Sequence, residues 1–220
     1  INYAIDREKM MKFLRKNIGY PAVSGLVPNG LNNDFYSDRY FKNTELANKY
    51  LNEYKKINDI ENISLDLTTD AQYLDILEFI QSELKSLGID LKINITPPSI
   101  LRQGKATGKF NIFRASWIAD YANPENYFSL FYSKNHTPYG PNYTFFQNEE
   151  YDKLYEQTLS LNKKDELNKI YEKLEEIINE FSPIIPLYYD MSVRLKQKNI
   201  FGLKNNPLNI LDLKTVYKKK

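Results

Sequence analysis

Alternating apolar and polar positions predict two strands in the first half of the chain, with a helix between them. Residues 63–67 alternate in this way, and residues 89–95 repeat the pattern. The apolar positions of residues 71–87 recur at helical spacing, and Gly88 stands where a glycine commonly ends a helix. A strand, a helix and a strand joined by short connections form a βαβ unit. We therefore expect these two strands to be parallel.

Helical spacing recurs in further stretches, and three of them begin near a side chain that can cap a helix N-terminus. The first stretch follows Asp6, and the second runs from Thr44 to Ile57. The third covers residues 151–159, and the fourth follows Asn162 and ends at Pro183. We expect residues 1–5 to be the stub of a helix, and the Gly-, Pro- and Tyr-rich segment 19–41 to wrap over the surface. Residues 184–190 are expected to form a buried strand, with 193–195 pairing onto it.

The stretch 110–131 connects a predicted strand to a short helix. Residues 110–116 have strand character, and Asn123 with Pro124 can begin a helix. Between them lie Trp117, which is the only tryptophan of the chain, and Asp120. A loop that leaves the end of a strand is a common place for binding residues. From the pattern alone, Trp117 as a core aromatic and Asp120 as a solvated turn residue remain equally open.

Composition favours a single globular domain and excludes several kinds of site. The chain has 220 residues, a formal net charge of +2 and no cysteine, so disulfides and thiolate metal sites are excluded. The near balance of charges argues against a nucleic-acid partner. His136 is the only histidine, and neither a zinc motif nor a GxSxG or phosphate-binding glycine motif is present. No apolar run has the length of a membrane span, and nothing indicates a cofactor.

Three segments resemble one known family. Residues 114–121, Arg-Ala-Ser-Trp-Ile-Ala-Asp-Tyr, with Asn-Pro-Glu at 123–125, resemble the signature of family 5 extracellular solute-binding proteins. These are the oligopeptide- and dipeptide-binding proteins of ABC importers. Residues 1–8 resemble the helix that enters the second lobe of that family, and residues 184–195 resemble the segment that leaves it.

The resemblance implies an α/β fold with a mixed, mainly parallel sheet flanked by helices. It implies one lobe of a two-lobed, type II periplasmic-binding-protein fold, formed by residues 1–193, with 194–220 as a tail that returns to the other lobe. The implied function is binding of short peptides rather than catalysis, with delivery to the permease subunits of an ABC importer. The implied location is extracytoplasmic, either periplasmic or lipid-anchored, and the first lobe is missing from this chain.

The resemblance also implies roles for individual residues. Asp120 matches the aspartate that binds the α-amino group of the peptide, and a carboxylate in a partly dry aromatic niche suits an ammonium ion. Arg114 matches an arginine that receives the C-terminal carboxylate at some peptide lengths, which a planar guanidinium can bind through two hydrogen bonds. Lys105 falls where some relatives carry a basic residue with that role, although plain solvation is the simpler explanation for a lysine.

The remaining site residues follow from the same match. Ser116 and Ile118 are expected to offer backbone groups to an extended peptide, as when a strand is added to a sheet edge. Trp117 and Tyr121 are expected to line pockets for peptide side chains. Gln72 falls where some relatives carry a histidine, so the capture of longer peptides is expected to differ.

Other functions remain open at this stage. The same fold can bind a dipeptide, a sugar or a metal chelate, although a single histidine argues weakly against a chelate held by several. Asp120 and Glu125 are a conceivable acid pair for a glycosidase, which requires carboxyl groups about 5–9.5 Å apart. A surface adhesion role has no specific feature in its favour.

Overall fold

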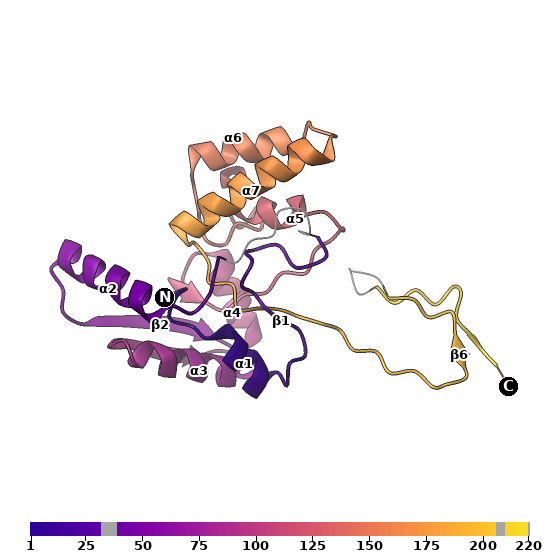
Figure 1. The fold of residues 1–220 in the computed structure, drawn as a ribbon, viewed down its shortest axis with the longest axis horizontal. Coiled ribbons are helices and arrows are strands. Elements are labelled where there is room, and N and C mark those ends of the chain that lie inside the picture. Colours follow the sequence, from indigo (N-terminus) through magenta and orange to yellow (C-terminus); the bar gives the residue numbers. More distant parts are fainter. Residues whose placement is uncertain (32–38, 206–209, 220) are drawn as a thin grey trace.

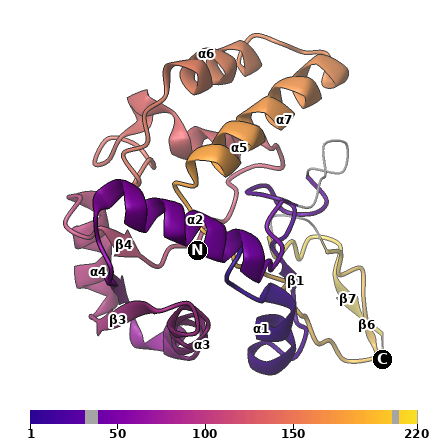
Figure 2. The same cartoon turned by 60° about the vertical axis from the view of Figure 1, so that its left-hand side comes forward.

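The molecule consists of two packed parts and a C-terminal hairpin, as Figure 1 shows. The structure is a computed structural model that describes residues 1–31, 39–205 and 210–219. The part built around a sheet is called the sheet part here, and the part built from helices after residue 124 is called the helical part (Figure 2). The hairpin, formed by residues 200–201 and 217–218, extends away from both parts in Figure 1.

A parallel three-stranded sheet lies at the centre of the sheet part. Strand β2 (Ile63–Thr69) lies between β3 (Ile89–Ile95) and β4 (Ile112–Phe113), and both neighbours run parallel to it. Strand β3 pairs with the whole length of β2. The predicted pair of parallel strands is therefore confirmed, and so is the α/β fold class.

Helices bury their apolar stripes against this sheet. Figure 1 shows α2 and α3 on either side of β2. The helices are α1 (Arg7–Leu14), α2 (Thr44–Asn58), α3 (Leu74–Lys85), which follows the 3-10 turn η1 (Ala71–Tyr73), and α4 (Pro98–Ala106). Helices α1, α2 and α3, strands β2 and β3 and the turn before α1 contribute to one core, whose buried members are Ala4, Ile5, Met10, Met11, Ala47, Leu67, Ile76, Leu77, Ile80, Leu84, Ile89 and Leu91.

The helical part has a second core, which is rich in tyrosine and phenylalanine. Its helices are α5 (Glu125–Phe128), α6 (Glu149–Thr158) and α7 (Lys164–Phe181), with the 3-10 turns η2 (Ser129–Phe131) and η3 (Ser133–Asn135). The Phe128 and Tyr171 rings stack with their centres 5.1 Å apart. The fully or nearly buried members of this core include Val27, Phe128, Phe131, Tyr151, Tyr155, Tyr171, Leu174 and Ile178.

The chain leaves the helical part through a segment that differs from the prediction. Only Tyr188–Tyr189 forms a strand, β5, and it pairs antiparallel with β1 (Tyr20–Pro21) rather than joining the main sheet. Residues 193–195 have no strand partner in the described part of the chain. The prolines at 183 and 186 lack the N–H groups that a longer ladder would need, which explains the short pairing.

The C-terminal residues form a small hairpin of β6 (Ile200–Phe201) and β7 (Tyr217–Lys218). The Phe201 and Tyr217 rings stack across it with centres 5.7 Å apart. Several apolar side chains on and before the hairpin are more than half exposed: Leu195, Ile210, Leu211, Leu213 and Tyr217. Figure 1 shows the connection to the hairpin running away from both packed parts.

Several predicted helix starts are shifted by one residue or more. The Asp6 cap is confirmed, since its side chain accepts the Lys9 N–H at 2.9 Å. Asn43 rather than Thr44 caps α2, and Lys163 rather than Asn162 precedes α7 without a side-chain cap. Residues 1–5 form a turn rather than a helix stub. The segment expected to wrap the surface, 19–41, lies partly outside the described residues.

Candidate functional site

An irregular extended segment leaves the carboxyl end of β4 and links the two packed parts. The Arg114 N–H still donates to the Thr68 carbonyl at 3.0 Å, beyond the two residues of the strand itself. Strand β2 ends at Thr69, so beyond Arg114 the segment has no partner strand among the described residues. The strand expected over 110–116 is therefore shorter than predicted. In open α/β sheets, ligands bind at the carboxyl ends of strands, which is where this segment begins.

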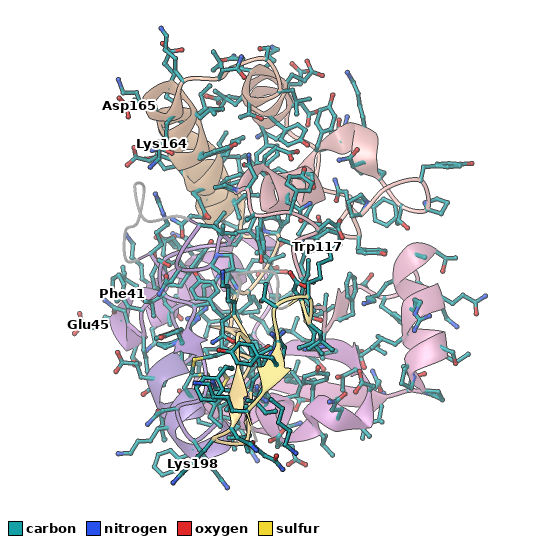
Figure 3. All side chains as sticks on the ribbon, turned by 90° about the vertical axis from the view of Figure 1, so that its right-hand side faces the viewer. Phe41, Glu45, Trp117, Lys164, Asp165 and Lys198 are labelled. Carbon is teal, nitrogen blue, oxygen red and sulfur yellow. The ribbon has the colours of Figure 1, made fainter. Side chains whose placement is uncertain are left out.

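Side chains along the segment alternate between the protein and the outside. Ser116, Ile118 and Asp120 are exposed, and Ile118 is 77% exposed. Trp117 is half-buried against the core of the helical part, and Ala119 is buried in it. Figure 3 shows Trp117 between the helical part and the sheet part. The alternation fixes which face of the segment is free to meet a ligand.

The backbone of this free face is also open. Among the residues that the structure describes, neither the N–H nor the C=O group of Ser116 has a hydrogen-bond partner, and the same holds for Ile118. Exposed backbone donors and acceptors on an extended segment can pair with another extended chain.

A buried asparagine holds the other face of the segment. The Asn126 side chain comes from the first turn of α5, and the residue is 4% exposed. Its Oδ1 accepts the Trp117 indole N–H at 2.8 Å and the Asp120 backbone N–H at 3.3 Å. The predicted start of this helix is shifted by one residue: Pro124 rather than Asn123 is the N-cap residue of α5, and the Asn123 Oδ1 accepts the Glu125 N–H at 2.9 Å.

Tyrosine hydroxyls surround Glu125 close to Asp120. Tyr121 and Tyr155 each donate to one oxygen of the Glu125 carboxylate. Burial raises the pKa of Tyr121, and the hydrogen bond to Glu125 raises it further. Burial and the same carboxylate also raise the pKa of Tyr155. Both phenols therefore remain neutral donors, and Glu125 is engaged on both of its oxygens.

Basic groups gather at the β4 end of the segment. The Arg114 guanidinium carbon lies 3.2 Å from the centre of the Tyr73 ring, and Nη1 donates to the Ser116 hydroxyl at 3.5 Å. Lys105 is half-buried, and its Nζ lies 5.6 Å from the centre of the Tyr143 ring. Burial lowers the pKa of Lys105, and the positive charge of Arg114 lowers it further. The two cations are close enough to repel each other, so an anion between them would be stabilised.

Several of these residues were not identified from the sequence. Asn126 directly follows the signature at 114–125 and has no chemical feature that marks it, and Tyr73 belongs to the predicted helical stretch 71–87. Tyr155 is 30 positions from Glu125. Gln72 is exposed at the start of η1, where its N–H donates to the Asp70 side chain. His136 is half-buried with Nε2 at 3.1 Å from the Phe146 carbonyl.

Neither a metal centre nor a membrane-crossing helix is present in the described ranges. No cluster of three or more histidine, aspartate or glutamate side chains is placed to hold a metal ion there. No helix within those ranges combines the length and the apolar character that crossing a bilayer requires.

Comparison with known proteins decides the family. The profile of the bacterial extracellular solute-binding proteins, family 5 Middle, matches residues 1–139. The chain belongs to family 5 of the bacterial extracellular solute-binding proteins. Among curated family members, it is 28% identical over 223 residues to the dipeptide-binding protein DppE of Bacillus subtilis, covering 96% of this chain and 40% of DppE. It is 24% identical to the oligopeptide-binding protein OppA of Bacillus subtilis, covering 92% of this chain and 38% of OppA. The family 5 chain described here thus spans about two fifths of the length of these relatives.

Solved structures of family members have the same fold. The oligopeptide-binding protein AppA from Bacillus subtilis, in complex with a nonapeptide, superposes with a TM-score of 0.80 and 25% identity over 100% of this chain and 46% of AppA. The murein tripeptide-binding protein MppA of Escherichia coli gives a TM-score of 0.84 at 24% identity over 100% of this chain and 44% of MppA. The expected periplasmic-binding-protein fold of type II is thereby confirmed.

Proposed function

We propose that this chain is one lobe of the peptide-binding component of an ABC importer, and that it supplies one wall of a peptide site. The proposal rests on the backbone N–H and C=O groups of Ser116 and Ile118, which have no hydrogen-bond partner among the described residues. The exposed carboxylate of Asp120 follows on the same segment. Backbone pairing is independent of ligand side chains, so it suits a protein that takes up peptides of varied sequence.

The charges at the two ends of the segment set the direction of the ligand. The peptide ammonium group binds Asp120, and the carboxylate of a peptide of suitable length binds Arg114. Lys105 stabilises the same anion, because its half-buried ammonium lies near Arg114. The peptide then runs antiparallel to residues 114–120, with Trp117 and Tyr121 beside its side chains.

A second lobe completes the site. Ile118 and Tyr121 are 77% and 46% exposed, which leaves apolar surface next to Asp120 for a closing partner to cover. In this proposal, residues 1–193 form the lobe and the tail 194–220 returns to the other lobe. The 95% exposure of Leu195 and the extended path of the hairpin support that division.

In this proposal, the protein binds a ligand and catalyses no reaction. Both oxygens of Glu125 accept tyrosine hydroxyls, so this carboxylate is poorly placed to act as a general acid beside Asp120. The proposed location is extracytoplasmic, and the proposed recipients of the peptide are the permease subunits of the importer. A dipeptide, a sugar or a metal chelate is the alternative ligand within the same fold.

A double-mutant cycle in a two-lobed protein that carries this chain tests the proposal. Asp120→Asn keeps the side-chain shape and removes the charge, and N-acetylation removes the ligand ammonium. Either change alone should weaken binding by about 30- to several-thousand-fold, because loss of one partner of a desolvated charge pair costs about 2–5 kcal/mol.

The cycle separates this contact from general effects. Calorimetric titration of the four combinations should show that the second change adds little, since both changes break the same pair. Asp165→Asn, at an exposed position of α7, is the matched control and should leave affinity unchanged. If the two losses simply add, Asp120 does not bind the amine. Mass spectrometry of co-purifying ligands should find mixed short peptides, and a single sugar or chelate would overturn the proposal.

A further inference from the structure

One buried amide is hydrogen-bonded to two residues of the proposed site, Trp117 and Asp120. Asn126 Oδ1 accepts from the Trp117 indole and from the Asp120 backbone at 2.8 and 3.3 Å. The side chain therefore links the Trp117 indole to the backbone of Asp120.

We propose that Asn126 is a positioning residue that holds Trp117 and Asp120 in the geometry that receives the peptide ammonium. This inference rests on the proposed function and deepens it, because it assigns the preorganisation of that site to one side chain. Asn126 itself is buried beneath the segment and does not touch the ligand.

The surroundings of Asn126 explain why it can act in this way. The neighbours Tyr127 and Phe128 are buried in the core of the helical part, so α5 is a rigid support. Asp120 is otherwise in an irregular segment, and the Asp120 N–H has Asn126 as its acceptor. A carboxamide suits this place because its oxygen can accept two hydrogen bonds without burying a charge.

The variant Asn126→Leu keeps the number and branching of the side-chain heavy atoms and removes the hydrogen-bond acceptor. Asn142→Leu is the matched control. Asn142 is fully buried and its Nδ2 donates to the Tyr132 and Phe146 carbonyls, so it is equally structural, but none of its hydrogen bonds reaches residues 114–121. Both variants should lose stability in urea unfolding, and only the first should affect the site.

The decisive measurement is the ratio of affinities for a free tripeptide and its N-acetylated form, in a two-lobed protein carrying this chain. We expect Asn126→Leu to reduce this ratio by about tenfold, which corresponds to about 1.4 kcal/mol, and Asn142→Leu to leave it unchanged. An unchanged ratio in Asn126→Leu would overturn the inference while leaving the proposed function intact. If the wild-type protein does not prefer the free amine, the proposed function itself fails.

A second measurement needs no variant. Trp117 is the only tryptophan of this chain, so its indole N–H gives one identifiable NMR signal. The indole N–H and the Asp120 backbone N–H should both be protected from hydrogen exchange in the unliganded chain, because each has Asn126 as its acceptor. Fast exchange of both would contradict the inference even if Asn126→Leu failed to fold.

Discussion

The guanidinium carbon of Arg114 lies 3.2 Å from the centre of the Tyr73 ring, so the two planar groups are in direct contact. Tyr73 lies in η1 after β2, and Arg114 follows β4, the strand that pairs with β2. The sheet thus brings together residues that are 41 positions apart, as their numbers show. The ring holds the guanidinium at the end of the segment where a ligand carboxylate is proposed to bind.

Replacing Tyr73 should weaken the binding of peptides with a free C-terminus. A cation–π contact contributes about 0.5–2 kcal/mol, so Tyr73→Leu should lower affinity by about 2- to 30-fold. The expected loss disappears for a C-terminally amidated peptide, because that ligand does not use Arg114. Calorimetric titration of both peptides measures the difference. Tyr139→Leu, at a ring that is 97% exposed, is the control and should change neither affinity.

Arg7 should be much more important for stability than its position on the first helix suggests. It is 2% exposed, and it donates to the carbonyls of Asn2, Ile5, Tyr40 and Pro186 at 2.6–3.4 Å. Burial lowers the pKa of Arg7 to about 10, so the side chain remains charged at neutral pH. It therefore joins the first residues of the chain to the segment that leaves the helical part.

The variant Arg7→Met keeps the apolar stem but leaves several buried carbonyls without a donor. Each such group costs about 1–3 kcal/mol, so the free energy of unfolding should fall by at least about 3 kcal/mol. Urea unfolding measures it. Arg15→Met is the control, because Arg15 pairs with Asp190 at 2.9 Å near the surface, where an ion pair contributes about 0–1 kcal/mol. Equal losses in both variants would contradict the assignment.

Stability should fall as pH rises from about 5 to 7 because of Glu175. The side chain is buried in α7, and its Oε1 accepts the Leu26 and Val27 N–H groups at 2.9 and 3.1 Å. Burial raises the pKa of Glu175 from 4.5 to about 7, against the smaller, lowering effect of those hydrogen bonds. Between these two pKa values, Glu175 is protonated in the folded protein and deprotonated in the unfolded chain. The free energy of unfolding therefore decreases as pH rises through this range.

The contribution of Glu175 to the free energy of unfolding should be largest below pH 4.5 and fully lost above pH 7. Between these values, the free energy of unfolding should fall by about 1 kcal/mol per pH unit. Urea unfolding at several pH values should show this slope in the wild type, and Glu175→Gln should remove it. Glu176→Gln changes the neighbouring, exposed side chain and should retain the slope. A wild type and a Glu175→Gln variant with parallel pH profiles would show that the group does not titrate in this range.

The chain by itself should bind peptides very weakly. Ser116, Ile118 and Asp120 are exposed, so water competes for the same hydrogen bonds and charge that a closed site would protect. Millimolar mixed tripeptides should therefore leave the melting temperature of the 220-residue chain unchanged in a thermal scan. A rise of several degrees would mean that one lobe is sufficient for binding. The two-lobed protein serves as the positive control.

The sequence determined the elements whose signals are local. The alternation in β2 and β3, the helical stripe of α7 and the Asp6 cap all depend on neighbouring residues, and each lies where the pattern predicts. The order of strand, helix and strand was sufficient to predict parallel pairing. The signature at 114–121 also placed Asp120, Trp117 and Arg114 together, because a short segment cannot separate its own residues.

The tertiary structure decided the contacts that join distant parts of the chain. Nothing in the local pattern pairs β5 with β1, brings Tyr73 beneath Arg114, or directs Arg7 to the Pro186 carbonyl. The role of Asn126 also follows only from packing. Its side chain accepts hydrogen bonds from Trp117 and Asp120 because the segment lies over α5. Periodicity shows which face of an element is buried, but the side chains that meet there depend on how the elements pack.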